Sequence, residues 1–203
     1  MRIERIIPPA RPGKPWLLGL TGGKVLRVTQ GEMADFALYS GMELEEETLA
    51  KLERKASQAV LRDKAVDMLT ANPMSSGELI QRLAVKGASQ EAAEQIAAWA
   101  AEIGLLNDES YAATVVCHYG AEGYGIFKIK SELSRRRIPR EYWDEALAQV
   151  GDPGEAIDGY LAAHLKSSDR KAVKKASDAL SRRGFSWQDI AAGLERFRAG
   201  ERD

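Results

Sequence analysis

The sequence has little cysteine or histidine, and this restricts its chemistry. Its 203 residues include one cysteine, Cys117, and two histidines, His118 and His164. A lone cysteine cannot form an internal disulfide, which favours a reducing compartment. On a helix Cys117 and His118 would point about 100° apart, so they do not form a nucleophile–base pair. Metal-ligand spacing and a Gly-Lys-Ser/Thr phosphate loop are both missing. We expect no catalytic residue, no metal site and no cofactor.

Long apolar runs and an excess of one charge are also missing. No stretch of about 18 apolar residues could span a membrane, and Pro8, Pro9, Arg11 and Pro12 interrupt the N-terminus where a signal peptide would be apolar. The 29 basic and 30 acidic residues balance, so any electrostatic partner must be sought in local patches. The sequence predicts a cytoplasmic monomer that is not bound to a membrane.

Residues 1–43 differ in composition from the remainder and are β-prone. Two short runs are joined by Thr21-Gly22-Gly23, which suits a hairpin turn with positive φ angles. A hairpin alone is marginal in water, so it should pack on the helices or be mobile. A structural cap and a contact role are both open for this segment. The expected strands and the short helix after them span 2–7, 16–20, 24–29 and 34–39.

From residue 44 onward the chain is expected to be wholly helical and repetitive. Superposing Leu83, Leu133 and Leu180 with the four residues after each gives spacings of 50 and 47 residues. Each match precedes a helix-starting residue, Ser89, Pro139 or Ser186. Tandem three-helix units contact mainly their neighbours, which predicts an elongated, curved array. The expected fold is therefore mostly α, with a small N-terminal β-hairpin element and repeats at 44–106, 107–151 and 152–203.

Two of these helices carry a dense set of cations. Around 126–137 an apolar stripe of Ile126, Ile129 and Leu133 leaves the other faces basic, and the segment from Lys166 onward is also locally basic. The run Arg135 to Arg137 could instead be a solvated helix end that complements the helix dipole. The candidate partner- or DNA-binding residues are Lys128, Lys130, Arg135, Arg136, Arg137, Arg140, Lys171, Lys174, Lys175, Arg182 and Arg183, with Tyr124 and Lys86 as possible contacts.

Several short motifs of the helical part of the chain carry a family resemblance by their order and spacing. They are Pro73–Leu79, Leu83–Gly87, Gly104–Ala112, Gly123–Gly125 and Ile129–Leu133. Over roughly 61–197 the sequence resembles the RecX family. Where that family commonly has Lys-Gly-Ile, this chain has Arg136-Arg137-Ile138, which costs a glycine helix stop and adds a charge at the helix end.

The resemblance implies a regulator in DNA repair, homologous recombination and the SOS response. It implies binding to the RecA filament on single-stranded DNA, and modulation, mainly inhibition, of its ATPase, recombinase and coprotease activities. It also implies three tandem three-helix repeats that lie in the filament groove. The alternative is a stand-alone, sequence-independent DNA-binding helical protein, because basic three-helix units resemble helix-turn-helix modules. Weak direct DNA binding is compatible with either reading.

Overall fold

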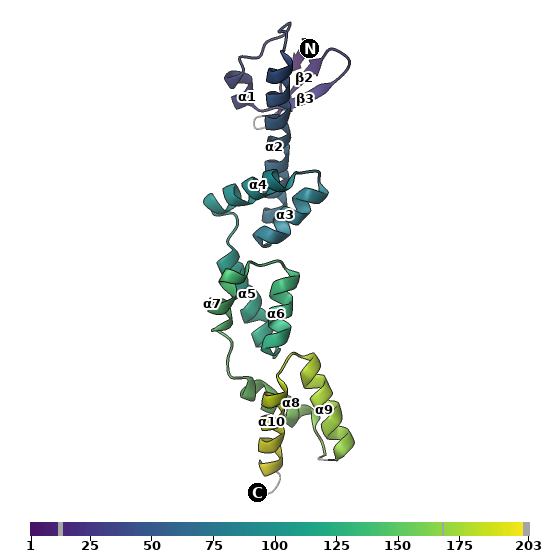
Figure 1. Cartoon of the computed structure of the whole chain (residues 1–203), viewed down its shortest axis with the longest axis vertical. Coiled ribbons are helices and arrows are strands. Elements are labelled where there is room, and N and C mark those ends of the chain that lie inside the picture. The colour runs from purple at the N-terminus through teal and green to yellow at the C-terminus, as the bar shows by residue number, and fades with distance from the viewer. Residues whose placement is uncertain (12–13, 168, 201–203) are drawn as a thin grey trace. The chain divides into compact units, whose positions relative to one another are not determined.

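The structure is a computed structural model that describes residues 1–11, 14–167 and 169–200. The protein is mostly α-helical with a small N-terminal sheet, as the sequence predicts (Figure 1). It forms two compact units, one of Met1–Ala71 with Leu83–Ile96 and one of Asn72–Arg82 with the chain from Ala97 onward. Within the described residues, no helix combines the length and the apolar character needed to cross a membrane.

The N-terminal strands form one antiparallel sheet in the order β1 (Ile3–Ile7), β2 (Trp16–Leu20) and β3 (Val25–Val28). In the β2–β3 hairpin Trp16 pairs with Val28, and Gly19 with Val25. The turn places Gly22 and Gly23 at φ angles of 86° and 80°, which residues other than glycine rarely adopt. The sequence prediction of a hairpin with a third strand is confirmed.

The short helix after the sheet lies earlier than expected. The prediction of 34–39 was wrong, because α1 spans Gln30–Asp35. Thr29 accepts a hydrogen bond from the Glu32 amide at 3.2 Å, and the Glu32 carboxylate accepts one from the Thr29 amide at 2.7 Å. This reciprocal capping box fixes the helix start. The pattern Thr29-x-x-Glu32 was the sequence signal for it.

The hairpin packs on the first part of α2 (Glu46–Ala71), the long helix that follows it (Figure 1). Leu18, Val28 and Leu52 are each 0 % exposed in this shared core. Because three short strands can form a stable sheet when one face is covered by a helix, this packing explains why the hairpin is ordered.

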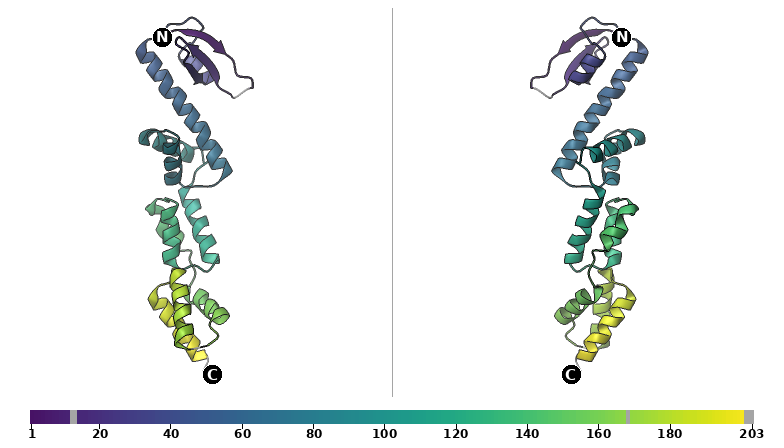
Figure 2. Two further views of the ribbon diagram at one scale, coloured as in Figure 1. Left: turned by 90° about the vertical axis from the view of Figure 1, so that its right-hand side faces the viewer. Right: turned by 90° about the vertical axis from the view of Figure 1, so that its left-hand side faces the viewer.

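The remaining helices follow the predicted repeat. Asn107 and Asp152 accept hydrogen bonds from backbone amides at the helix starts that they cap. The ribbons of α5 to α7 and of α8 to α10 can be followed in Figure 2. Each of these two groups has a hydrophobic core of its own, which fits tandem three-helix repeats. The helices are α3 (Ser76–Val85), α4 (Gln90–Glu102), α5 (Asp108–Ala121), α6 (Ile126–Arg135), α8 (Pro153–His164), α9 (Arg170–Arg182) and α10 (Trp187–Gly200).

Pro139 was expected to start a helix, and the helix that follows it is short. A 3-10 turn, η1 (Arg140–Tyr142), leads into α7 (Trp143–Leu147). The Tyr142 amide donates to the Pro139 carbonyl, and the Val150 amide donates to the Leu147 carbonyl. Both hydrogen bonds join residues three positions apart, as in a 3-10 helix, and not four apart as in an α-helix. The chain is therefore wound more tightly at both ends of α7.

The helix stop that seemed lost at Arg137 is present. The Arg137 amide donates to the Ser134 carbonyl at 2.9 Å, and the Ile138 amide to the Leu133 carbonyl at 3.1 Å. This is a Schellman motif, and it places Arg137 at a φ angle of 54°. Gly87 and Gly184 occupy the same position after α3 and α9, at 93° and 89°. An arginine therefore adopts a backbone conformation that normally favours glycine.

Replacing Arg137 by glycine should stabilise the protein. A left-handed conformation costs a residue with a Cβ atom roughly 1–2 kcal/mol, part of which the greater flexibility of unfolded glycine offsets. We expect Arg137→Gly to raise the free energy of unfolding in urea by about 0.5–1 kcal/mol. The matched change Gly87→Ala, where an added Cβ would meet nothing within 4 Å, should lower it by about as much. A loss of stability in Arg137→Gly would contradict this assignment.

Candidate functional site

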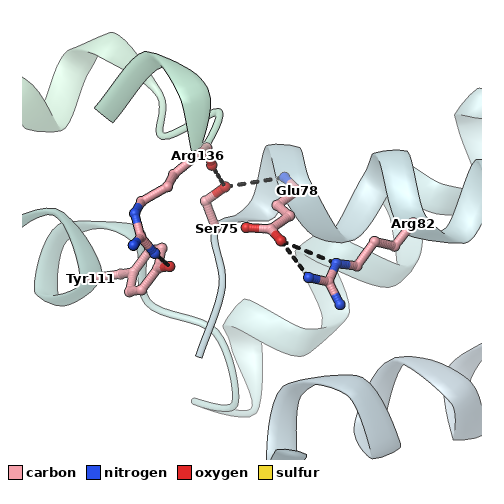
Figure 3. Close-up of polar contacts among 5 residues, drawn as sticks. All are labelled: Ser75, Glu78, Arg82, Tyr111 and Arg136. Carbon is pink, nitrogen blue, oxygen red and sulfur yellow. Dashed lines mark hydrogen bonds and ion pairs between the residues drawn. The ribbon is translucent and has the colours of Figure 1, made fainter. Parts of the chain in front are cut away.

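The start of α3 is held by the turn that follows α6, although these segments are about sixty residues apart in sequence. The buried Ser75 hydroxyl donates to the Arg136 carbonyl at 2.5 Å and accepts from the Glu78 amide at 3.1 Å (Figure 3). Ser75 and Glu78 have the spacing of a capping box, but only half of it forms, because the Glu78 carboxylate accepts from Arg82 at 2.6 Å instead. Ser75 therefore links a helix start to a helix end.

Glycine allows the close approach at this contact. A Cβ atom at Gly77 would lie 2.5 Å from the Arg137 carbonyl oxygen and 2.8 Å from its Cβ, which is closer than real side chains pack. The Ser76 amide also donates to the buried Asp108 carboxylate at 2.8 Å. At the start of α3 the free amide of Ser76 is thus met by a group from α5, while the turn after α6 accepts from the Ser75 hydroxyl.

The same contact recurs one repeat later, between the start of α6 and the turn after α9. The Gly125 amide donates to the Arg183 carbonyl at 2.9 Å, and the Phe127 amide donates to the Gly184 carbonyl at 3.1 Å. A Cβ atom at Gly125 would overlap the Gly184 carbonyl. We call these two contacts, at Ser75–Gly77 and at Gly125–Phe127, the repeat junctions. Gly123-Tyr124-Gly125 thus turns the chain between α5 and α6, and its second glycine also permits the junction.

Two of the candidate binding arginines point into the protein at equivalent repeat positions. Arg136 donates to the Tyr111 hydroxyl at 2.6 Å (Figure 3). Arg183 donates to the carbonyls of Glu122 and Gly123, both at 3.2 Å. Its guanidinium also lies over the rings of Tyr124 and Tyr160, at 5.3 and 5.4 Å. Arg136 and Arg183, together with Tyr124, are therefore occupied by internal contacts, and a partner contact at any of them remains a prediction.

The junction glycine should be intolerant of any side chain. Because an added Cβ at Gly125 meets backbone rather than a flexible side chain, we expect Gly125→Ala to lower the free energy of unfolding by about 2 kcal/mol or more. Gly159→Ala is the matched control in α8, where the added atom meets nothing within 4 Å, and should be neutral or slightly stabilising. The measurement is the free energy of unfolding in urea. Equal effects of the two changes would contradict the close backbone contact at Gly125.

A buried glutamate organises the cations of α6. Glu132 is 7 % exposed, and its two oxygens accept from Lys128 at 3.0 Å and from Arg135 at 2.7 Å. Burial alone would raise the pKa of Glu132, but the hydrogen bonds from Arg135 and Lys128 outweigh it and lower the pKa from 4.5 to about 2. Part of the positive charge predicted for this helix is therefore neutralised internally.

Glu132 with its ion-pair partners Lys128 and Arg135, which we call the Glu132 cluster, should make the free energy of unfolding depend on pH. Its native pKa lies below the unfolded value, so its contribution is complete above about pH 5 and is lost as the pH falls toward 2. We expect Glu132→Gln to cost about 2–3 kcal/mol in unfolding free energy at pH 7, and the difference from the native protein to shrink by about 2 kcal/mol at pH 3. The measurement is urea unfolding of both proteins at pH 7 and pH 3. An equal difference in unfolding free energy at the two pH values would contradict the role of the Glu132 cluster.

The other candidate cations are exposed and free of ion pairs within the described part of the chain. Lys171, Lys174 and Lys175 lie on α9 at helical spacing, opposite its buried Ala176 and Leu180. Asp169 caps this helix through the amides of Lys171 and Ala172, and these bonds, after one from Ser167, hold its pKa below its ordinary value. We call the following set the exposed basic residues: Lys130, Arg137, Lys171, Lys174, Lys175 and Arg182. Arg140 is exposed too and stacks on Trp143 at 4.8 Å.

Two exposed aromatic residues were missed by sequence reasoning. Phe127 is 59 % exposed and Trp187 is 70 % exposed. Ile126 was expected on the buried stripe of α6 and is 38 % exposed, because the stripe begins only at Ile129. The sequence did contain a signal that Phe127 is exposed. It precedes a lysine and lies outside the four-residue spacing that Ile129 and Leu133 share on the buried face of α6. Lys86, the remaining possible contact, is exposed in the other compact unit.

Comparison with known proteins identifies the family. Residues 107–147 match the family described as RecX, second three-helix domain. Regulatory protein RecX of Vibrio cholerae is 30 % identical over 146 residues, covering 68 % of this chain and 93 % of that protein. The corresponding protein of Pseudomonas fluorescens is 32 % identical over 136 residues, covering 64 % of this chain and 87 % of its own length. The chain belongs to the RecX family.

Solved RecX structures share its fold. A crystal structure of regulatory protein RecX superposes with a TM-score of 0.75 at 21 % identity and covers 96 % of this chain and 98 % of its own. RecX from Lactobacillus salivarius gives 0.61 at 19 % identity, over 70 % of this chain and 97 % of its own. The family assignment establishes a regulatory protein. The resemblance drawn from the sequence motifs is therefore confirmed at the level of family and fold.

Proposed function

We propose that this RecX protein binds the RecA filament on single-stranded DNA and lowers its ATPase, recombinase and coprotease activities. Membership of the RecX family is the observation that supports this most strongly. The repeat junctions support it as well, because they hold consecutive helices of one compact unit in a fixed register and thus present a preformed surface. A preformed surface loses less conformational entropy on binding than a mobile one.

We assign the contact to the exposed basic residues. These cations are not neutralised by ion pairs within the described chain, unlike Lys128 and Arg135, so they can attract carboxylates of a protein or phosphates of DNA. A contact spread over many such residues would let each contribute modestly. Two further candidates, Arg136 and Arg183, serve this surface indirectly, because they fix the turns that position it.

Direct DNA binding is the second candidate. The three lysines of α9 have the spacing and freedom to contact phosphates without reading bases. Such binding would weaken steeply with salt, since each phosphate contact releases a counterion. It would also require no RecA, which separates it from the main proposal.

A charge-reversal series on α9 tests the proposed surface. We expect the triple variant Lys171→Glu, Lys174→Glu, Lys175→Glu to inhibit RecA ATP hydrolysis on single-stranded DNA about tenfold less effectively than the native protein, because each reversed charge repels the acidic or phosphate groups it met before. The measurement is the ATP hydrolysis rate as this protein is titrated up to the RecA concentration.

The control carries three reversals at residues that are not among the exposed basic residues, Arg11→Glu, Lys14→Glu and Lys51→Glu, and should inhibit like the native protein. Equal inhibition by both variants, with unchanged helical circular dichroism, would remove α9 from the surface. Inhibition by neither the native protein nor any variant, combined with salt-sensitive binding to DNA alone, would replace the proposal with the DNA-binding alternative.

A further inference from the structure

The N-terminal unit contains an open cleft that is separate from the exposed basic residues. Strand β3, helix α2 and the turn between α3 and α4 line it, and all of these residues belong to one compact unit. Its volume of about 480 Å³ lies in the range of ligand pockets. We call it the N-terminal cleft. The sequence suggested no site here except the possible contact at Lys86.

The cleft is lined by cations in marked excess over acids. Arg27, Lys64 and Lys86 line it and are exposed, and none has an ion-pair partner in the described chain. Lys24 pairs with Glu53 at 2.6 Å, and Glu53 is the single carboxylate among the lining residues. Three uncompensated positive charges around one concave surface focus a positive potential into it. The ligand should therefore carry more than one negative group.

The floor of the cleft is aliphatic. Val25, Val60 and Leu61 contribute to it, and Val25 is 53 % exposed although it lies in a strand. A free phosphate or nucleotide would leave this apolar surface in water. Single-stranded nucleic acid binds on aromatic stacking platforms, and no aromatic residue is among those that line the cleft. An acidic peptide with aliphatic side chains matches both its charge and its floor.

We propose that the N-terminal cleft docks an acidic, aliphatic segment of a protein partner. Carboxylates of the segment pair with Arg27, Lys64 and Lys86, while an aliphatic side chain covers Val25 and Val60. The sheet then has a contact role in addition to its packing on α2. This site adds a second attachment point to that on α9, and linking two modest contacts in one chain raises the overall affinity.

Binding of a model peptide tests this site with the full chain and without RecA or DNA. The probe is a fluorescein-labelled peptide in which glutamate and leucine alternate, followed by fluorescence anisotropy. We expect saturable binding that weakens about tenfold or more in Arg27→Glu, Lys64→Glu. The matched control Arg11→Glu, Lys51→Glu reverses two exposed charges outside the cleft and should bind like the native protein. Circular dichroism verifies that both variants are folded.

Companion probes separate the charge from the apolar contribution. Peptides with glutamine for glutamate, or with serine for leucine, should each bind more weakly than the original. The proposal is overturned if the native protein does not bind the peptide, if both double variants bind it equally, or if the glutamine peptide binds as well. It is also overturned if oligo-dT binds in a manner that depends on Arg27 and Lys64 while the peptide does not. None of these results bears on RecA inhibition through α9.

Discussion

The fixed contact between a helix start and the following repeat's helix end is the constraint on which the second compact unit depends. Helix starts have unpaired amides and helix ends have unpaired carbonyls. At one junction the amides of Gly125 and Phe127 donate to the carbonyls of Arg183 and Gly184, and at the other the Ser75 hydroxyl donates to the Arg136 carbonyl. The requirement for close approach explains the glycines at positions 77 and 125. It also explains why Arg137 adopts a left-handed conformation, because the turn must direct the Arg136 carbonyl toward the Ser75 hydroxyl.

This constraint divides the basic residues into two groups. Arg136 and Arg183 extend from the junction turns onto tyrosines and backbone carbonyls, and Lys128 and Arg135 neutralise the buried Glu132. Their positively charged groups are thus engaged in contacts within the protein. The exposed basic residues, above all those of α9, retain charge that a partner can use. A count of lysine and arginine along the chain cannot make this distinction, because it depends on where each side chain finds an acceptor.

The sequence was sufficient for features that arise locally. Hydrophobic spacing and capping residues such as Ser89 and Ser186 predicted the helices, and Gly22-Gly23 predicted the hairpin turn. It was insufficient where distant segments decide the outcome. The inward orientation of Arg136 requires Tyr111, and the helix stop at Arg137 looked lost because local preference disfavours it. The overlooked α1 start is a different case, since the Thr29–Glu32 capping box was visible in the sequence.

The most direct test of the account is hydrogen–deuterium exchange of this protein with and without RecA filaments on single-stranded DNA. The account predicts that amide exchange slows across 170–182 when the filament is added, and that DNA alone has little effect at physiological salt. Unchanged exchange in this helix while the filament is inhibited, or equal protection by DNA alone, would contradict the central claim that RecA filaments are bound through the exposed basic residues.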